Sequence, residues 1–340
     1  MNNKVACVIP AAGWGSVCPV RSSPKVLADL GDEIMLDRII NTVLEADVAD
    51  SLVVVIGNGR YGEQVRAALK GNHYGKLHIV TQPERRGAAD AVAKALPYLN
   101  GESHVLVTFG DMPLWRAETF KALIKAHLDH GQAAISMVTL RVKEGHRTEK
   151  YGRIVRDSSG RILAALEPSE LAGRELPGAA FVNPSLYVFE RSWLMKRLPD
   201  IPPTDKGDGF PAELHLPKLL PLAHDEGVNI VEVPLEDPSE ALGVNVPEEL
   251  DEVRAILRVR EETAEILAFV REHRAKYAIE VGSAVPELWR ESEIGFYLFG
   301  VLAVTPEFTG GWSALSEHEI RTATLERVRF EKNKLASAND

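Results

Sequence analysis

The sequence has few cysteines, no basic surplus and no long apolar run. Its 340 residues include 2 cysteines, Cys7 and Cys18. Two thiols make neither a disulfide framework nor a metal-binding cluster, which is typical of a reducing compartment. The apolar start is too short for a signal peptide and lacks a cleavage pattern, so we expect a cytoplasmic protein.

The charge balance and the apolar runs exclude further classes of protein. The chain has 39 Lys and Arg against 49 Asp and Glu, a formal net charge of -10. Nucleic-acid binding requires a basic surplus, so we expect no such partner, although a polyanionic small ligand needs only a few local cations. The longest apolar run, Ile294–Val304, is too short to span a bilayer, so we expect no membrane partner.

Strand-like and helix-like segments alternate along the first half of the chain. Apolar, β-branched runs predict strands, and helical periodicity fills the intervals between them. The expected strands are Val5–Pro10, Leu52–Ile56, Leu77–Val80 and Val105–Phe109, and the expected helices are Ile34–Ala46, Tyr61–Leu69, Ala88–Leu96 and Ala117–Leu128. This alternation predicts an α/β fold with a doubly wound, mostly parallel, Rossmann-like sheet that binds ligands beyond the carboxyl ends of its strands.

The pattern changes from about Ala133 to one that predicts a β-rich insert. The segment "AAISMVTLRV" predicts a strand, and "GRIVRDSSGRILAALE" predicts a hairpin that turns at residues 158–160. Another strand, "AAFVNPSLYVFE", is interrupted at Pro184. The remaining expected elements are helices at Arg191–Leu198 and Glu213–Glu226, a strand at "NIVEVPL" and a long helix from Pro247 to about Tyr277. We expect the insert to complete a cleft rather than to form a separate domain.

The first expected strand ends in a loop of small residues. Ala11, Ala12 and Gly13 follow the strand, Gly15 comes next, and Lys25 lies further along. Backbone without bulky side chains can approach phosphates and donate N–H groups to them, and a lysine adds a compact positive charge. Glycines of this kind also occur in ordinary surface turns, so the loop alone does not decide the function.

A second glycine-rich segment carries a dinucleotide-binding pattern. Gly57, Gly59 and Gly62 form G-x-G-x-x-G between a strand and a helix. The pattern follows the second expected strand rather than the first. No acidic residue ends the next strand, where Gln82 stands instead. Dinucleotide binding is therefore the less favoured alternative.

Single polar residues stand at other strand ends. Asp111 ends a buried strand in "VLVTFGDMPL", and Asn245 stands at a strand-to-helix junction in "LGVNVPEEL". Taken singly, each is as well explained by a turn or a helix cap. The segment "TQPERRGAADAVAKAL" places Gln82 and two arginines before a helix, where a solvated charged loop is the alternative.

The order of these motifs resembles that of the sugar-1-phosphate nucleotidyltransferases, above all the pyrophosphorylase domain of N-acetylglucosamine-1-phosphate uridylyltransferases. The resemblance runs from Val5 to Leu257 and rests on "AAGWG…SPKVL", "Q-x-E-x-x-G", "GDMPL", "YGRI", the strand leading to Glu167, "VNPSLYVF", "AELHLPKLL" and "LGVN". It implies the nucleotide-diphospho-sugar transferase fold. Residues 1–252 would form the nucleotidyltransferase domain with a sugar-binding insert, and residues 253–340 a helical C-terminal extension.

The resemblance implies an activity and a set of site residues. A sugar-1-phosphate oxygen would attack the α-phosphorus of a nucleoside triphosphate, with UTP favoured, to form a nucleotide sugar such as UDP-N-acetylglucosamine and pyrophosphate. Asp111 and Asn245 match the family's Mg²⁺ ligands, and Lys25 matches a catalytic lysine on the phosphates. Other positions match nucleotide contacts at Pro10, Ala11, Ala12, Gly13, Gly15, Gln82, Gly87, Ala88, Phe109 and Gly110, and sugar contacts at Gly152, Glu167 and Asn183.

The chain departs from the family in the opening loop. Where the family reads G-x-G-T-R, residues 13–17 read GWGSV, so the loop arginine is Val17. We expect Arg21 to reach the same phosphate oxygens as a catalytic group, because this loop differs in length from those of its relatives. Losing one preorganised donor to a developing charge costs roughly 2.7–4 kcal/mol in the barrier. Ala88 replaces a threonine, and a Glu-Tyr-Tyr segment has become residues 213–215, Glu-Leu-His. Two functions remain open: a slow enzyme, or a catalytically impaired nucleotide-sugar sensor or scaffold.

The C-terminal tail lacks the hexapeptide period of the β-helix acyltransferases that are often fused to this domain. We therefore expect no acyl transfer by residues 283–340. Trp289, Trp312 and the run Ile294–Val304 predict a helical tail that packs against its own domain or against a second subunit in a homo-oligomer. Ser316–Glu319 has a capping-box pattern and predicts the start of the last helix.

Overall fold

A computed structural model describes most of the chain. The described residues are 3–13, 23–70, 77–142, 144–167, 170, 180–205, 211–272, 322, 325–326, 328–330 and 332–333. The chain divides into two compact units, Met1–Arg254 and Ala255–Asp340. The candidate functional residues that the structure describes all lie in the first unit.

The described strands of the first unit form one ten-stranded sheet in the order β3-β2-β1-β4-β9-β5-β8-β6-β7, with β10 paired to β5. Its strands are β1 (Val5–Ala11), β2 (Ser51–Gly57), β3 (Leu77–Gln82), β4 (His104–Val107), β5 (Ala133–Arg141), β6 (Arg153–Arg156), β7 (Ile162–Leu166), β8 (Phe181–Val182), β9 (Tyr187–Glu190) and β10 (Asn229–Leu235). The pairings make β1–β6 and β10 run in one direction and β7, β8 and β9 in the other. The predicted mostly parallel sheet is confirmed.

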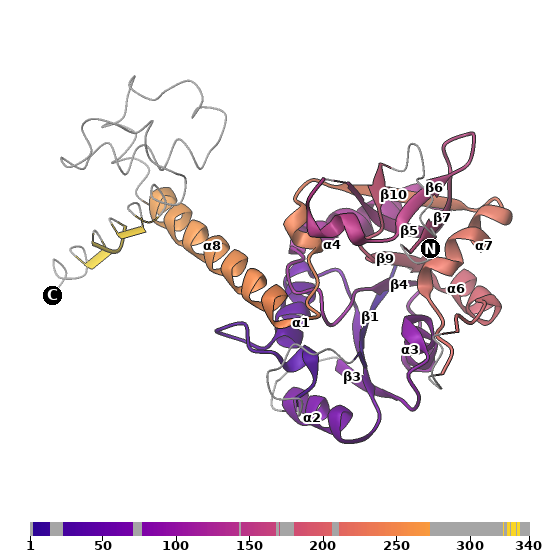
Figure 1. Cartoon of the computed structure of the whole chain (residues 1–340), viewed down its shortest axis with the longest axis horizontal. Coiled ribbons are helices and arrows are strands. Elements are labelled where there is room, and N and C mark those ends of the chain that lie inside the picture. Colours follow the sequence, from indigo (N-terminus) through magenta and orange to yellow (C-terminus); the bar gives the residue numbers. More distant parts are fainter. Residues whose placement is uncertain are drawn as a thin grey trace. The chain divides into compact units, whose positions relative to one another are not determined.

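Helices cover both faces of this sheet (Figure 1). The described α-helices of the first unit are α1 (Met35–Ala46), α2 (Gly59–Lys70), α3 (Gly87–Ala95), α4 (Ala117–His130), α6 (Arg191–Arg197) and α7 (Leu219–Asp225), and α8 (Pro247–Glu272) begins in this unit and ends in the second. Residues of α3, α6 and α7 share one buried apolar cluster with β1, β2, β4, β5 and β9. α1 and α4 pack on the opposite face, so the fold is doubly wound as the alternating pattern predicts.

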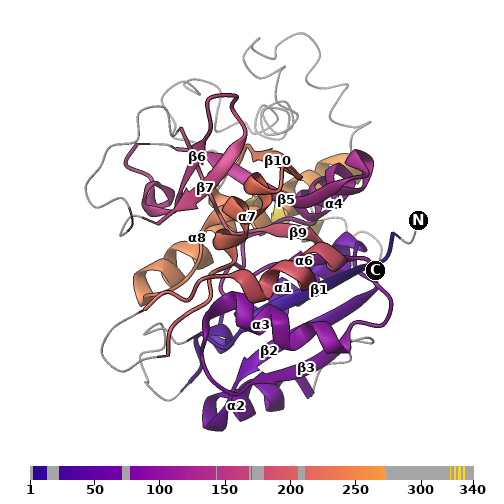
Figure 2. The same ribbon diagram turned by 90° about the vertical axis from the view of Figure 1, so that its right-hand side faces the viewer.

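The parallel strands bring distant loops to one edge of the sheet. β1 pairs with β2 on one side and with β4 on the other, and all seven of its residues are buried or nearly so. Strands buried on both faces read as continuous apolar runs, which is why "VACVIPA" predicts its position so well. Figure 2 shows β1, β2 and β3 side by side. The loops after β1, β3 and β4 therefore meet beyond their carboxyl ends.

The G-x-G-x-x-G pattern has a packing role in this fold. A Cβ on Gly62 would lie 1.8 Å from the carbonyl oxygen of Gly57 and 3.7 Å from Ile56 Cδ1. Gly62 is buried in α2 and Gly57 ends β2. The glycine at position 62 therefore lets α2 pack directly on the end of β2.

The predicted helix over Glu213–Glu226 is wrong in its first turns. A 3₁₀ turn covers Leu216–Lys218 and α7 begins only at Leu219. Thr204 and Glu213 instead exchange two backbone hydrogen bonds, of 2.8 and 2.9 Å. This extended bridge excludes helical geometry at Glu213 and places the following residue against the loop before α3.

The predicted strand "AAFVNPSLYVFE" is two strands with different partners. β8 pairs with β5 and β6, whereas β9 pairs with β4 and β5. Between them, Pro184 lacks an N–H group and Ser185 has a φ of 63°. Together these residues redirect the chain from one pairing to the next.

The helix predicted to begin at Pro247 is confirmed and extends to Glu272. In the second unit, Glu265 forms ion pairs with Lys332 and Arg329, at 3.1 and 3.4 Å. Trp289, Trp312, Ile294–Val304 and Ser316–Glu319 lie outside the described residues. Of the helices that the structure describes, none is long and apolar enough to cross a membrane.

Candidate active site

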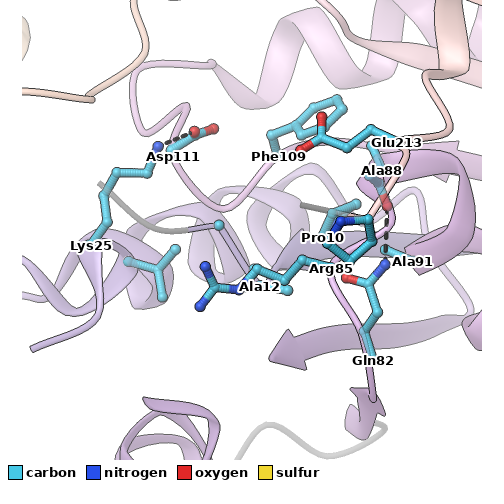
Figure 3. A pocket seen from close by; sticks show the side chains of 15 residues that line it. Pro10, Ala12, Lys25, Gln82, Arg85, Ala88, Ala91, Phe109, Asp111 and Glu213 are labelled. Carbon is cyan, nitrogen blue, oxygen red and sulfur yellow. Dashed lines mark hydrogen bonds and ion pairs between the residues drawn. The ribbon is translucent and has the colours of Figure 1, made fainter. Parts of the chain in front are cut away.

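A pocket of about 550 Å³ lies beyond the carboxyl ends of β1, β3 and β4 (Figure 3). Residues from all three loops line it, together with residues from the 3₁₀ turn Lys25–Leu27 and from the segment before Leu216. The lining residues are Pro10, Ala11, Ala12, Gly13, Lys25, Val26, Gln82, Arg85, Gly87, Ala88, Ala91, Phe109, Asp111, Pro211 and Glu213. Ten of the residues that the resemblance assigns to the site are thus gathered around one cavity.

Lys25, Asp111 and Asn245 form a polar cluster at this pocket. Lys25 Nζ donates to Asp111 Oδ2 at 2.6 Å and to Asn245 Oδ1 at 2.9 Å. The Lys25 side chain is only 5% exposed, and that of Asp111 is 29% exposed. Both acceptor atoms therefore bind the same ammonium group. The Asp111 and Asn245 side chains thus contact a distant lysine rather than a local turn or helix cap, which were the alternative interpretations.

Backbone contacts hold the Asn245 segment against the loop after β4. Val244 N donates to the carbonyl oxygen of Asp111 at 2.9 Å. The Tyr151 hydroxyl donates to the Ala241 carbonyl at 2.7 Å and accepts from Gly243 N at 3.3 Å. Burial raises the pKa of Tyr151, so this phenol stays neutral in its structural role. These bonds fix the position of Asn245 relative to Asp111.

The first turn of α8 is capped without the Asn245 side chain. Glu249 Oε2 accepts from the backbone N–H of Asn245 at 2.5 Å and of Val246 at 3.3 Å. A carboxylate in this position satisfies N–H groups that the helix leaves without partners. The amide of Asn245 is thus available for Lys25.

Gln82 shapes the loop before α3. Its side chain is buried, and Nε2 donates to the Gly87 carbonyl at 3.1 Å and to Asp90 Oδ2 at 2.7 Å. Gly87 has a φ of +84°, which disfavours any side chain. Gln82 therefore stabilises the loop at Gly87 in a backbone conformation that only glycine adopts easily.

The chain around Leu214 lies directly against this glycine loop. A Cβ on Gly87 would lie 2.5 Å from the Leu214 carbonyl oxygen. Leu214 accepts from Ala89 N at 3.0 Å and donates to the Arg86 carbonyl at 2.7 Å. This pairing brings Glu213 to the pocket wall, and the sequence alone did not place it there.

Gly110 supports the pocket from beneath and is absent from its lining. Its N–H donates to the Pro10 carbonyl at 3.0 Å. A Cβ at this position would lie 3.2 Å from Ala11 Cβ, from the Pro10 carbonyl oxygen and from Val26 Cγ1. The loop after β4 therefore packs against the loop after β1.

The three sugar-contact candidates lie together but do not line this pocket. Asn183 N donates to the Gly152 carbonyl at 2.9 Å, and a Cβ on Gly152 would lie 3.0 Å from Glu167 Oε1. Asn183 is buried, donates to the Tyr187 hydroxyl at 2.6 Å and accepts from Ser185 N at 3.0 Å. Its side chain thus has a local structural role.

Two candidates lie outside the described residues, and five lining residues are new. Gly15 and Arg21 fall in the undescribed part of the opening loop. The structure adds Val26, Arg85, Ala91, Pro211 and Glu213 to the site. Arg85 belongs to the charged loop after β3, and only the path of that loop shows which of its two arginines faces the pocket.

The charge of Arg85 is affected by its surroundings. The residue is partly buried, and burial lowers the pKa of its guanidinium, while the Tyr61 phenol acts in the opposite direction. Removing part of the hydration shell of a cation is unfavourable unless an anion compensates for it. Arg85 is thus a partly buried cation of the pocket wall.

The residues at the cluster fit a hard divalent cation such as the Mg²⁺ that the resemblance implies. Asp111 Oδ2 and Asn245 Oδ1 are carboxylate and amide oxygens, the donors that Mg²⁺ prefers, and both already bind a positive charge. Among the described residues, no group of three or more His, Cys, Asp or Glu side chains could hold a metal ion. A cation here would therefore need further oxygen ligands from water or substrate.

The chain matches a known protein family over this region. The profile of the family described as "MobA-like NTP transferase domain" matches residues 7–187. The chain belongs to this family. The match includes β1, the pocket loops after β1, β3 and β4, and the strands up to Tyr187, so the predicted relationship to the nucleotidyltransferases is confirmed.

Individual relatives agree with this assignment. The bifunctional protein GlmU of Solibacter usitatus (strain Ellin6076) is 31% identical over 276 residues, which cover 79% of this chain and 55% of that protein. The chain spans about half the length of the curated relatives it matches.

Two solved structures share the fold. A putative glucose-1-phosphate thymidylyltransferase from Bacillus anthracis, in complex with a sucrose, has a TM-score of 0.57 at 16% identity and covers 75% of this chain and 95% of its own. CMP:2-keto-3-deoxy-manno-octonic acid synthetase, complexed with CTP, has a TM-score of 0.56 at 18% identity. The match covers 76% of this chain and 99% of the synthetase chain. The predicted Rossmann-like fold is thus confirmed.

Proposed function

We propose that this protein is a Mg²⁺-dependent sugar-1-phosphate nucleotidyltransferase that uses UTP. The observation that carries the proposal is the Lys25–Asp111–Asn245 cluster, of which Lys25 and Asp111 line the pocket built from the loops after β1, β3 and β4. The family membership and the GlmU relatives support nucleotidyl transfer. The choice of UTP rests on the likeness to GlmU.

In the proposed reaction, a phosphate oxygen of the sugar 1-phosphate forms a bond to the α-phosphorus of UTP. The bond between that phosphorus and the oxygen bridging to the β-phosphate breaks, and pyrophosphate leaves with the electron pair. Such transfers depend on in-line positioning and neutralisation of charge rather than on a covalent intermediate. The products are a UDP-sugar and pyrophosphate.

Each group of site residues has a distinct task in this proposal. The small side chains of Ala11, Ala12 and Gly13 leave room for the nucleotide against the backbone after β1. Gln82 and Gly87 form the wall proposed to face the base. The Lys25 ammonium moves from Asp111 toward the phosphates and offsets their charge.

Asp111 and Asn245 would hold the Mg²⁺ ion. When bound, this ion supplies positive charge that stabilises the phosphate oxygens and the leaving pyrophosphate. The backbone bond from Val244 N to the Asp111 carbonyl keeps the two ligands in place before substrate arrives.

The sugar is proposed to lie toward the insert formed by β6, β7 and β8. Gly152 and Glu167 approach one another there, and a carboxylate suits sugar hydroxyl groups as an acceptor. Asn183 supports this region through Tyr187 and Ser185. Ala88 replaces a hydroxyl-bearing residue near the base, which we expect to affect nucleotide affinity.

The experiment measures pyrophosphate release with Mg²⁺ across four nucleoside triphosphates and glucose, N-acetylglucosamine, mannose and galactose 1-phosphates. We expect turnover with UTP, and a loss of roughly 100-fold or more in Asp111→Asn, because a charged ligand and a partner of Lys25 are removed. Asp129→Asn, which changes an exposed carboxylate on α4, is the matched control and should retain activity.

Two results would contradict the proposal in different ways. Turnover that survives Asp111→Asn at the control level would reject the metal site. Nucleotide-sugar binding by calorimetry without turnover for any substrate pair would instead support the alternative, a sensor or scaffold.

A further inference from the structure

The pocket wall carries balanced charge before any nucleotide binds. Among the described lining residues, Lys25 and Arg85 are cationic, and Asp111 and Glu213 are anionic. The Lys25 ammonium is bound to Asp111 and Asn245. A nucleoside triphosphate brings several negative charges, so its binding requires cations beyond one lysine and one metal ion.

Arg85 lies where it can meet this requirement. It follows Gln82, the last residue of β3, in the loop that leads to Gly87. Figure 3 shows its side chain extended along Pro10 and Ala12, with the guanidinium directed toward the Lys25 side of the pocket and away from Gln82. This direction places the charge away from the wall proposed to face the base.

The chemistry of the side chain also favours phosphate. A guanidinium presents five N–H donors in a planar fork and binds two phosphate oxygens at once. The residue is partly buried at the pocket wall, where solvent ions screen a contact between charges less than on the open surface. The opening loop has Val17 where the resembling family has an arginine, so position 17 offers no guanidinium to the phosphates.

The neighbouring arginine differs in position but not in charge. Arg86 is exposed and does not line the pocket, and its backbone carbonyl accepts from Leu214 N at 2.7 Å. Its side chain projects from the same loop into solvent. Because the long-range charge of both residues is the same, any difference between their substitutions reports a local contact.

We propose that Arg85 is a phosphate-binding residue of this site, whose guanidinium donates to the non-bridging oxygens of the nucleoside triphosphate beside Lys25. This inference rests on the proposed function, because it assumes that a nucleotide binds in the pocket. It adds a guanidinium from the loop after β3 to the positive charge of Lys25.

The test compares Arg85→Gln with Arg86→Gln. Calorimetry measures the affinity of wild type and both variants for the magnesium complex of UTP and for uridine. We expect Arg85→Gln to lose about 10- to 100-fold in UTP affinity, which is the range for one charge-assisted contact, with unchanged uridine affinity. Arg86→Gln should stay within about twofold of wild type, the ordinary range for a surface substitution.

Equal UTP affinities of Arg85→Gln and Arg86→Gln would overturn the inference. An equal loss for uridine and UTP would also overturn it, because the contact would then be to the base or ribose. If Arg85→Gln does not fold, Arg85→Lys makes the same comparison, since it keeps the charge and loses the fork. We then expect an intermediate loss specific to the triphosphate, and no loss overturns the inference.

Failure of this inference is distinguishable from failure of the proposed function. If the wild-type enzyme turns over and the two glutamine variants behave alike, the proposed function stands and the role of Arg85 is rejected. If the wild-type protein binds no nucleoside triphosphate, both the proposed function and the role of Arg85 are rejected.

Discussion

Lys25 Nζ lies 2.6 Å from Asp111 Oδ2, although the two residues are 86 positions apart in the chain. The same ammonium reaches Asn245 Oδ1, which comes from a third segment. The two atoms proposed as metal ligands are thus also the two acceptors of the lysine. A divalent cation that uses these lone pairs has to displace the ammonium or share the oxygens with it.

We predict that Lys25→Met increases the affinity of the nucleotide-free protein for Mn²⁺ by about tenfold or more. The substitution removes a positive charge adjacent to both ligands and frees their lone pairs, and charge repulsion at such distances is large in a partly buried site. Free Mn²⁺ measured by electron paramagnetic resonance during a titration gives the affinity directly. Turnover should fall in the same variant.

The control for this prediction is the double variant Lys25→Met with Asp111→Asn. It should lose the gain in Mn²⁺ affinity if the metal binds at Asp111. Equal affinity of wild type and Lys25→Met would show that the lysine and the metal do not compete for these oxygens.

A second prediction concerns the contact between Gly87 and Leu214. Gly87→Ala should lower the free energy of unfolding by about 1–2 kcal/mol for the positive φ alone. The clash with the Leu214 carbonyl at 2.5 Å should add to this cost and weaken nucleotide binding, because the two backbone bonds of Leu214 cannot both persist. Urea denaturation and calorimetry with magnesium UTP measure the two effects.

Gly160→Ala is the matched control for the backbone term. Gly160 has a φ of +86°, nearly that of Gly87, and a Cβ there would meet nothing within 4 Å. We expect it to show the conformational cost without a change in nucleotide affinity. If both variants lose the same stability and neither loses affinity, the contact with Leu214 does not shape the site.

Some features of this fold could be predicted from local sequence. The buried parallel strands appear as continuous apolar runs, and helical periodicity marks α1, α2 and α4 to within a few residues. Asp111 could be placed at the edge of the sheet because it follows a buried strand. That it shares a cation with Asn245 depends on a resemblance, since their spacing of 134 residues (245 − 111) carries no local signal.

Other features depend on contacts that local sequence does not encode. The sequence predicts a helix from Glu213, but the backbone of Glu213 pairs with that of Thr204. The loop after β3 contains two adjacent arginines of equal charge. Only the three-dimensional path of the loop places Arg85 in the pocket and Arg86 in solvent. Tertiary backbone pairing overrides local propensity in the first case, and loop geometry decides the second.

The final prediction concerns acid stability through His127. This side chain is buried between His104 Nδ1 at 3.0 Å and Ser136 Oγ at 2.8 Å. Burial, followed by repulsion from His104 and His130, lowers the pKa of His127 to about 4, against an opposing effect of Glu190. The unfolded chain, with an ordinary histidine pKa near 6.5, binds the proton more readily than the folded protein.

Stability should therefore fall as the pH drops from about 6.5 to about 4, and the contribution of His127 to this fall amounts to at most about 3 kcal/mol. Urea denaturation at several pH values measures the free energy of unfolding. His127→Gln should flatten this dependence, because glutamine keeps a polar contact to Ser136 without a charge to bury. His130→Gln removes an exposed histidine from the same helix and with it the smallest of the repulsive causes, so it should reduce the slope much less than His127→Gln. Equal slopes in all three proteins would show that the folded protein binds a proton at His127 as readily as the unfolded chain does, and would contradict the prediction.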